Sequence, residues 1–496
     1  MRKGSALCPT RPTAGALARR MPSRLALLLL AFPAASFGQA PKAPDSAFDI
    51  TLEEIAGQRH YQHPLRPQLH YTPLQGHIGD ATGLFYYAGE YHLFYMYDQW
   101  SRRRAAHKQW GHAVSRDLLH WEELPAVLDT VLDNRPGSGS GIVDWNDSAG
   151  LRRGGPEKTV MIFYTDYQRG TGIAYSRDRG RTWTRHVRNP VIAGATDARD
   201  PTVFWHAPTG DWRMVRYEKK GFAFYKSANL VEWTWLSRVD GYFECPDLVQ
   251  LPVLNAAGER RWVLIDGDGS YVLGEYDGDH FTAATLKLQA EYGKALYATQ
   301  TWKRTLESGS PIVQVAWTRY PDIPRLTWNG QTSFPVELTL WKFADGIRLC
   351  RRPIDELDNL RVGEQRWCDL MVEGEKPMPE IAASLLDLRV ELEPAGAAMV
   401  GLNLAGHQIR YSSAAQTLQV GTVIAPLALD GNRVRLRILL DRSSIEVFAD
   451  HGQVTISAVK LEPQSASPVT LVSEGGKMRV AVLQVNRLES IWADRQ

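Results

Sequence analysis

The sequence predicts an all-β protein in which a β-propeller is followed by a β-sandwich. From about Gln68 to Leu349, short apolar and aromatic runs are broken by Gly, Asp, Asn or Pro every 8 to 12 residues. This spacing is typical of antiparallel strands joined by tight turns. A motif recurs within this region, and the composition changes after it. The two observations together indicate two β domains of different architecture.

The recurring motif predicts the propeller. It reads SRDLLHW at residues 115–121, SRDRGRTW at 176–183 and SANLVEW at 227–233, and each copy follows a Gly-containing aromatic strand. The copies recur at intervals of about 50 to 60 residues, which is room for about four strands, and a repeat of that length is typical of propeller blades. In the middle copy, SxDxGxTW, the Ser and Asp side chains are expected to cap backbone donors while the Trp packs between strands. We therefore interpret the motif as a structural turn rather than a catalytic one.

The second domain follows a short connecting segment. The stretch RRPIDELDNLR at residues 351–361 contains a Pro and a plausible short helix, and beyond it tryptophans nearly vanish. Alternating apolar runs such as LLDLRVELEP, VRLRILLD and SSIEVFAD then predict a sandwich-like domain. We expect the propeller at residues 66–350, a linker at 351–372 and the sandwich at 373–496.

The N-terminus predicts export. Basic residues up to Arg24 precede the apolar run LALLLLAFPAASFG, which is short for a membrane span and is followed by small residues. We interpret residues 1–40 as a cleaved signal peptide, with Met21 as an alternative start, and residues 41–65 as a lead segment. The mature chain is then expected to begin near Gln39 or Pro41 and to be secreted or periplasmic, with no membrane attachment after cleavage.

Charge and cysteine content limit the partners. The 57 Lys and Arg residues nearly balance the 55 Asp and Glu residues, for a net charge of +2 among 496 residues. Nothing in this balance favours a nucleic acid or an anionic membrane, so a neutral substrate is expected. After signal cleavage Cys245, Cys350 and Cys368 remain, an odd number that argues against a disulfide framework. A bridge between Cys350 and Cys368 stays open.

Three acidic residues stand at the entrances of apolar strands in three blades. Asp80 lies in HIGDATGLFYY, Asp200 in ARDPTVFW and Glu244 in GYFECPDLVQLPV. Strand entrances of this kind open onto the axial funnel of a propeller, so the three carboxylates are expected to converge there. Arg199, next to Asp200, is expected to hold a neighbouring carboxylate ionised, because a nearby cation lowers the pKa of an acid.

These segments resemble glycoside hydrolase family 32, the invertase, inulinase and levanase group. GHIGDATGLFYY is similar to the family's nucleophile motif, Arg199, Asp200 and Pro201 match its RDP motif, and Glu244 and Cys245 match its acid/base motif EC. Further matches are QWGHAVSRDLLHW, the SGS of residues 138–140, YATQTW and DRSSIEVFADHG, in the family's order over about residues 66–496. The resemblance implies a five-bladed propeller with a C-terminal β-sandwich.

The same resemblance implies the roles of individual residues. Asp80 would be the nucleophile, Glu244 the general acid/base, and Asp200 a third carboxylate that binds ring hydroxyls. No metal ion or cofactor is required by such a site. The residues that it implies for substrate binding are His77, Met96, Trp110, Ser138, Ser140, Arg199, Tyr297 and Trp302.

The sequence departs from the family around the nucleophile. His77 and Gly79 stand where the family has Trp and Asn, Ala81 and Thr82 replace Pro and Asn, and Met96 replaces a Gln. Gly and Met cannot replace the hydrogen bonds that Asn and Gln make with a sugar, and each lost bond costs about 1 kcal/mol. The usual specificity is therefore in question, while the chemistry is expected to survive.

The expected reaction is retaining hydrolysis of a β-fructofuranoside. A covalent glycosyl-enzyme forms through an oxocarbenium-like state, and Glu244, expected to be the most buried acid, keeps its proton longest. The expected partner is a fructan, fructo-oligosaccharide or related furanoside. Three alternatives remain: a fructosyltransferase, another furanosidase such as an arabinan-acting enzyme, and a carbohydrate-binding propeller without catalysis. Linkage, exo or endo action and oligomeric state stay open.

Overall fold

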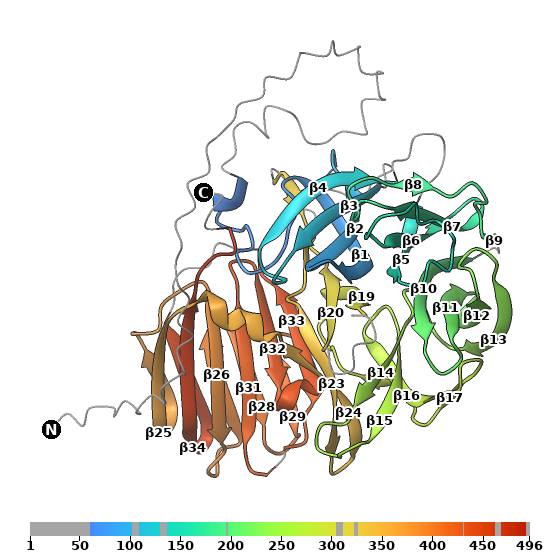
Figure 1. The fold of residues 1–496 in the computed structure, drawn as a ribbon. Helices are drawn as coiled ribbons and strands as arrows, with labels where there is room; N and C mark the ends of the chain where they lie inside the picture. The colour runs from blue at the N-terminus through green and yellow to red at the C-terminus, as the bar shows by residue number, and fades with distance from the viewer. Residues whose placement is uncertain are drawn as a thin grey trace, which may run out of the picture.

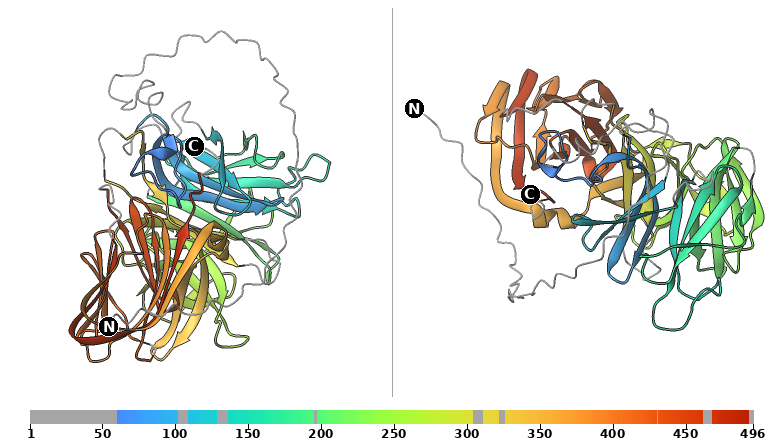
Figure 2. Two further views of the ribbon diagram at one scale, coloured as in Figure 1. Left: turned by 90° about the vertical axis from the view of Figure 1, so that its left-hand side faces the viewer. Right: turned by 90° about the horizontal axis from the view of Figure 1, so that it is seen from above.

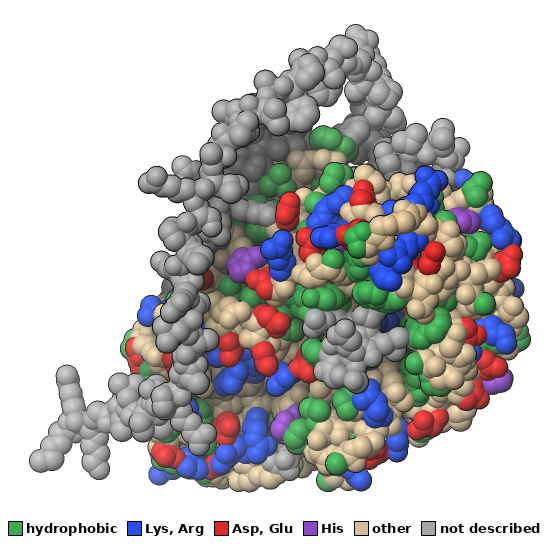
Figure 3. Space-filling view, viewed as in Figure 1, with side chains coloured by type: hydrophobic (Ala, Val, Ile, Leu, Met, Phe, Trp, Pro, Cys, Tyr) green, Lys and Arg blue, Asp and Glu red, His purple; other side chains and the backbone are tan. Residues whose placement is uncertain are grey.

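A computed structural model describes residues 60–101, 109–128, 136–194, 197–303, 311–321, 326–429, 431–461 and 468–492. Two β domains lie side by side, a ring of sheets and a stack of long strands (Figures 1 and 2). On the face that Figure 3 shows, basic and acidic side chains are interspersed. The all-β prediction, a five-bladed propeller followed by a sandwich, is confirmed. The signal peptide expected at 1–40 lies outside the described residues, as does the lead segment up to residue 59.

The first three blades are antiparallel sheets whose inner strand comes first in the chain. The first blade contains β1 (Gly76–Tyr87), β2 (Glu90–Asp98), β3 (Gln109–Ser115) and β4 (Trp121–Val127). The second contains β5 (Pro136–Asp144), β6 (Thr159–Asp166), β7 (Gly170–Ser176), β8 (Thr184–Arg185) and β9 (Ile192–Ala193). The third contains β10 (Ala198–His206), β11 (Asp211–Glu218), β12 (Gly221–Ser227) and β13 (Thr234–Asp240).

The last two blades follow the same order and complete the ring. The fourth contains β14 (Asp247–Pro252), β15 (Arg260–Ile265), β16 (Ser270–Tyr276), β17 (Phe281–Ala283) and β18 (Leu288–Gln289). The fifth contains β19 (Leu296–Trp302), β20 (Ile312–Thr318), β22 (Gln331–Thr332), β23 (Val336–Phe343) and β24 (Gly346–Pro353). Between β20 and β22, β21 (Trp328–Asn329) pairs in parallel with β1. This pairing joins the last blade to the first and so closes the ring.

The repeated motif forms structural turns, as predicted. Each copy connects the third strand of a blade to its outer edge, and the Asp117 carboxylate accepts the backbone N–H of His120 at 2.8 Å. In the second copy Asp178 accepts the N–H of Thr182 at 2.9 Å. The Trp at the end of each copy donates its indole N–H to a backbone carbonyl of the same turn, at 2.9 to 3.1 Å. The Asp and Trp side chains of the motif therefore form hydrogen bonds within their own turns.

The C-terminal domain is one folded sheet built around two long strands. β25 (Arg361–Met378) pairs with β34 (Val469–Leu488) along nearly its whole length, while β34 also pairs with β27 at one end and β26 at the other. The other strands of the domain are β26 (Leu386–Glu393), β27 (Met399–Leu404), β28 (His407–Ser412), β29 (Thr417–Val420), β30 (Val423–Pro426), β31 (Val434–Leu440), β32 (Ser444–Ala449) and β33 (Val454–Val459). Three short 3₁₀ helices complete the described elements: η1 (His60–Gln62), η2 (Asp355–Leu360) and η3 (Asp450–Gly452).

Part of the segment expected as a linker belongs to this sheet. Residues 351–353 finish β24, η2 follows, and β25 begins at Arg361 rather than after residue 372. The side chains of Trp367 and Val372 are buried in the sandwich core. Other residues of the segment, such as Glu364, Asp369 and Met371, are exposed and interrupt the apolar alternation, so the sequence pattern predicts the boundary too late.

The late DRSSIEVFADHG segment holds the two domains together. Its Asp441 accepts the backbone N–H groups of Gln68 and Leu69 at 2.8 and 2.9 Å, and Nδ1 of His70 lies 2.7 Å from the same carboxylate. Glu446 lies 3.3 Å from the other ring nitrogen of His70. Burial alone would lower the pKa of His70, but the two carboxylates outweigh it and raise that pKa to about 9. The interface therefore contains a charged, fully buried histidine.

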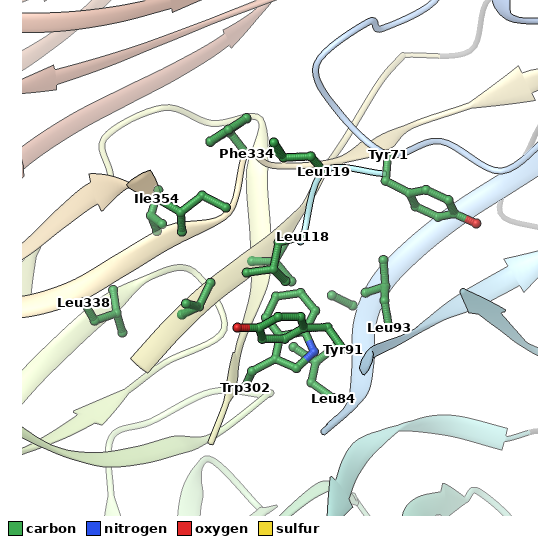
Figure 4. Packing of buried hydrophobic residues seen from close by; sticks show 14 of the residues in the cluster. Tyr71, Leu84, Tyr91, Leu93, Leu118, Leu119, Trp302, Phe334, Leu338 and Ile354 are labelled. Atoms are coloured by element: carbon green, nitrogen blue, oxygen red, sulfur yellow. The ribbon is translucent and has the colours of Figure 1, made fainter. Parts of the chain in front are cut away.

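Apolar packing continues across the same boundary. One large cluster joins the first and last blades to the start of the second domain, and Figure 4 shows Tyr71, Leu118, Trp302, Phe334 and Ile354 in it. Because its residues come from both ends of the propeller, this cluster fixes how the ring closes. Cys245, Cys350 and Cys368 are free thiols, so the bridge that the sequence left open is absent among the described residues. Within those residues there is also no helix both long and apolar enough for a membrane span.

Candidate active site

Backbone irregularities bring the predicted acids to one end of the inner strands. The pairing of β1 with β2 shifts register between Ile78 and Ala81, around Asp80. β10 shifts between Arg199 and Thr202, around Asp200, whose φ is 57°. Bulges of this kind re-aim a side chain and are common beside active sites. They turn each carboxylate out of the regular alternation of its strand.

Glu244 reaches the same end by a different route. It lies just before β14, and both Glu244 and Cys245 have positive φ values, 51° and 43°. Such a conformation costs a non-glycine residue roughly 1 to 3 kcal/mol and persists only where the surroundings impose it. The contacts of both residues with Asp200 and Arg199, described below, provide that constraint. The turn therefore places Glu244 opposite the bulges.

Asp80 is paired with a serine of the next blade. Ser138 Oγ donates a hydrogen bond of 2.8 Å to Asp80 Oδ2. Ser138 is itself placed by a register shift between Gly137 and Gly139 at the start of β5. Its backbone carbonyl accepts the hydroxyl of Thr165 at 2.9 Å, which orders the strand end. The Asp80 carboxylate is thus oriented by a buried hydroxyl and remains partly open to solvent.

Asp200 is the most buried acid of the site, with 3% of its surface exposed. The N–H of Cys245 donates to Asp200 Oδ2 at 3.1 Å, and the Cys245 thiol lies 3.7 Å from the same oxygen. Burial and the nearby charge of Asp80 raise the pKa of Asp200 to about 7, against the lowering effect of the Cys245 N–H. Around neutral pH, Asp200 therefore holds a proton in part of the molecules while Asp80 faces it.

Glu244 is held by an arginine and a tyrosine. Arg199 Nε donates to Glu244 Oε1 at 2.9 Å, and the hydroxyl of Tyr297 donates to Oε2. The Glu244 side chain is 25% exposed, so the prediction that it is the most buried acid was wrong. The difference arises because Asp200 lies inside a strand between two blades, whereas Glu244 lies on a turn at the rim.

Arg199 connects the acids to each other. Besides Glu244 it contacts Asp197, and its Nε lies 3.9 Å from Asp200 Oδ2. Its guanidinium lies 4.1 Å from the ring centroid of Tyr217, which supports it from one side. Burial disfavours the charge, but these carboxylates outweigh it and raise the pKa of Arg199. Arg199 therefore lies among the acids of the site, while its predicted role of holding a neighbouring carboxylate ionised stays a prediction.

The structure does not bring every predicted substrate-binding residue to this end. Trp110 and Trp302 have no exposed surface and donate their indole N–H groups to the backbone carbonyls of Gly137 and His92. Both lie inside the core, so their prediction as substrate contacts was wrong. The hydroxyl of Ser140 accepts the N–H of Val203 at 2.9 Å and so joins two blades.

Two departures from the family pattern are coupled in space. A Cβ atom on Gly79 would lie 3.1 Å from the Cβ of Met96, closer than nearly all such contacts. The absence of a side chain at residue 79 therefore makes room for Met96, which is partly buried against the core of the first two blades. His77 is 8% exposed and packs edge-on against Trp317, with ring centroids 5.6 Å apart. The wall beside Asp80 is thus more apolar than an Asn and Gln pair would make it.

Sequence reasoning missed Tyr167 at the rim of the site. It lies in the turn between β6 and β7, and its ring covers Gly137, where a Cβ would come within 2.7 Å of it. Burial of its hydroxyl and the charges of Asp200 and Asp80 raise its pKa. The residue as a whole is 49% exposed. No motif marks this residue, because its position depends on the length of a hairpin rather than on a pattern.

The three acids of the site lie in different surroundings. Among the described residues no group of three or more His, Cys, Asp or Glu side chains is arranged to hold a metal ion. What the geometry offers is an oriented carboxylate, a second acid able to carry a proton, and a third acid held by an arginine and a tyrosine. Enzymes that cleave glycosidic bonds commonly use a pair of carboxyl groups whose different environments give them different pKa values.

Matches to family models show which protein family the chain belongs to. The model of the glycosyl hydrolases family 32 N-terminal domain matches residues 70–353, and the family 32 C-terminal model matches residues 356–487. The chain belongs to glycoside hydrolase family 32. It is therefore a glycosidase, with the propeller and the sandwich as the two parts that the family models describe.

Relatives with curated names support the same assignment. The chain is 31% identical to a levanase of Bacillus subtilis over 88% of its own length and 72% of the relative's. It is 27% identical to an extracellular exo-inulinase of Aspergillus niger, over 89% of this chain and 98% of that one. A crystal structure of exo-inulinase from Aspergillus awamori superposes with a TM-score of 0.80 at 25% identity, covering 87% of this chain and 100% of that chain.

Proposed function

We propose that this family 32 glycosidase is an exported, retaining β-fructofuranosidase that hydrolyses fructans or fructo-oligosaccharides. The observation that carries the proposal is the convergence of Asp80, Asp200 and Glu244 at one end of the inner strands. The names of the levanase and the exo-inulinase support a fructan substrate. They also favour hydrolysis over fructosyl transfer and over arabinan cleavage.

In the first step Asp80 attacks the anomeric carbon of the fructosyl unit. The hydrogen bond from Ser138 Oγ to Asp80 Oδ2 orients this carboxylate for the attack. Glu244 gives its proton to the leaving oxygen, so that the glycosidic bond breaks as the bond to Asp80 forms. Substrate that displaces Tyr297 or Arg199 from Glu244 would prepare this carboxylate to carry the proton.

In the second step the covalent intermediate is hydrolysed. Glu244, now ionised, takes a proton from water, and the water attacks the anomeric carbon to release fructose with its configuration retained. Arg199 and Tyr297 are in place to stabilise Glu244 in this form. We expect the Asp80 and Glu244 carboxyl groups to lie ~5 to 5.5 Å apart in the substrate complex, the separation of retaining enzymes.

Asp200 acts on the substrate rather than on the bond that breaks. Its side chain lies at the base of the site, where it can accept hydroxyl groups of the sugar ring. A carboxylate that binds these hydroxyls more tightly as positive charge develops stabilises the transition state selectively. The N–H and thiol of Cys245 fix its orientation. A binding-only propeller has no need for this arrangement of three acids.

Purified protein assayed on levan, inulin, sucrose and arabinan tests the proposal. We expect fructose release from levan or inulin and none of the pentose from arabinan. The Asp80→Asn variant should be inactive on every furanoside, and the surface variant Asp240→Asn on β13 serves as its control. Release of arabinose, or fructan turnover by Asp80→Asn, would overturn the proposal. Export is tested separately by N-terminal sequencing of protein recovered outside the cytoplasm.

A further inference from the structure

A second cavity lies at the opposite end of the inner strands. Its volume is about 530 Å³, and its floor comes from Phe85 on β1, Val143 on β5, Val203 on β10 and Leu248 on β14. Along β1, Phe85 is five residues beyond Asp80, which at ~3.3 Å per residue separates the two by about 17 Å. None of the three acids lines this cavity. It is therefore distinct from the site described above.

The walls of the cavity are aromatic. They contain Tyr86, Trp145, Phe204, Trp205, Trp212 and Trp262. Trp145 is 39% exposed and stands at the rim, whereas the floor residues are buried. The indole N–H of Trp212 is used by Ser148 at 3.0 Å. Those of Trp145, Trp205 and Trp262 have no hydrogen-bond acceptor among the residues that the structure describes, and they remain available to a ligand.

The charge of the cavity favours a neutral ligand. Lys303 is the single charged side chain among its described lining residues, and its Nζ lies 2.7 Å from the buried carboxylate of Asp247. The pair leaves no net charge to attract a phosphate or an acid. The other polar lining groups are the neutral amides of Asn146 and Gln250. The cavity therefore suits a neutral ligand with flat apolar faces and a hydroxyl-bearing edge.

We propose that this cavity binds a neutral sugar chain at a distance from the bond that is cleaved. Tryptophan faces pack against the C–H faces of sugar rings, while indole N–H groups and amides bind their hydroxyls. That the sugar consists of fructosyl units rests on the proposed function. A polymer held here keeps its other units at a high local concentration near the catalytic site, so that the second contact becomes intramolecular. The benefit is limited to substrates long enough to reach both ends.

Calorimetry on a catalytically dead enzyme tests the cavity directly. In an Asp80→Asn background, levan and inulin oligosaccharides should bind at two classes of site. Trp145→Ala should remove one class, with a loss of affinity of roughly five- to tenfold. The matched control is Trp235→Ala, since Trp235 is 56% exposed on β13 outside the cavity. It should bind like the parent.

Kinetics on the enzyme with Asp80 intact give a second readout. Trp145→Ala should lower the ratio of kcat/KM on polymer to kcat/KM on a trisaccharide, and Trp235→Ala should not. Equal ratios in the two variants, with unchanged stoichiometry, would overturn the inference. So would binding of a neutral apolar dye such as Nile red in the cavity without any competition from sugars.

The outcomes separate this inference from the proposed function. If the intact enzyme hydrolyses fructan but the cavity variants behave like the control, only the second site is wrong. If no fructan is cleaved, yet a different neutral polysaccharide binds in a manner that depends on Trp145, the cavity stands and the proposed substrate is wrong. A panel of levan, inulin, arabinan and starch distinguishes these cases.

Discussion

Replacing Asp200 by Asn should stabilise the protein while it abolishes activity. The folded protein raises the pKa of this carboxyl from its ordinary value of 3.8 to about 7, chiefly because the group is buried and faces Asp80. A carboxyl whose folded pKa is raised supports folding most below its unfolded pKa, and that support is lost as the pH rises to the folded value. At pH 8 the ionised carboxylate of Asp200 thus destabilises the folded state, and Asp200→Asn removes this buried charge.

The magnitude follows from the size of the shift. The difference of about three pKa units corresponds to ~4 kcal/mol at pH 8, as an upper limit, and to less than half of that at pH 5. Asn keeps an oxygen that can accept the N–H of Cys245, so little else is lost. The advantage of Asp200→Asn over the parent should therefore grow by ~2 to 3 kcal/mol between pH 5 and pH 8.

Thermal and urea unfolding at the two pH values measure this effect, and Asp387→Asn is its matched control. Asp387 is also fully buried, but hydrogen bonds from Arg437 and Arg361 outweigh burial and lower its pKa. Removing that charge leaves the partly buried Arg361 and Arg437 with Asp358 as their remaining ionic partner, which costs at most ~3 to 5 kcal/mol. The two variants should thus shift the unfolding midpoint at pH 8 in opposite directions. Destabilisation by Asp200→Asn at pH 8 would refute the reasoning.

Three further predictions concern other parts of the molecule. The folded protein raises the pKa of His70 from 6.5 to about 9, so protonated His70 stabilises the folded state by up to ~3 kcal/mol below pH 6.5. This contribution is lost as the pH rises towards 9. In urea titrations, His70→Gln should therefore make the unfolding free energy depend less on pH over this range. Because Gly79 and Met96 replace hydrogen-bonding residues, sucrose should be a poor substrate relative to longer or differently substituted furanosides, and sucrose turnover as fast as levan turnover would show that these changes are silent. Export predicts a mature N-terminus near Gln39 or Pro41, and a cytoplasmic protein with Met1 or Met21 intact would contradict it.

Much of the fold was predictable because local signals agree with it. The motif at residues 115–121, 176–183 and 227–233 carries its own hydrogen bonds within each turn, so its spacing reports blade length directly. The alternation of the late strands reports a half-buried sheet in the same way. The start of β25 was misjudged because its polar face interrupts the apolar pattern over most of residues 361–372.

The acids were predictable from motifs, but their environments were not. Which acid is most buried depends on how bulges and turns in different blades meet, and no single strand reveals that Asp200 lies deeper than Glu244. For Trp110 and Trp302 the sequence wrongly predicts substrate contacts, because a tryptophan in a motif can pack in the hydrophobic core as well as against a ligand. Tyr167 reaches the rim through a hairpin turn that carries no signature. Contacts between blades are long-range in sequence and become visible only in the assembled ring.

The most direct test of the account is to capture the intermediate on Asp80. Glu244→Gln removes the proton donor, which should slow ordinary substrates by ~10² to 10⁴, while a fructosyl fluoride still reacts because its leaving group scarcely needs protonation. Since Gln cannot activate water, the fructosyl-enzyme should accumulate, and mass spectrometry should find the added fructosyl mass on the peptide that contains Asp80. Added azide should restore turnover by attacking without a base. An equal slowing of fluoride and natural substrates, with no labelled peptide and no response to azide, would contradict the mechanism.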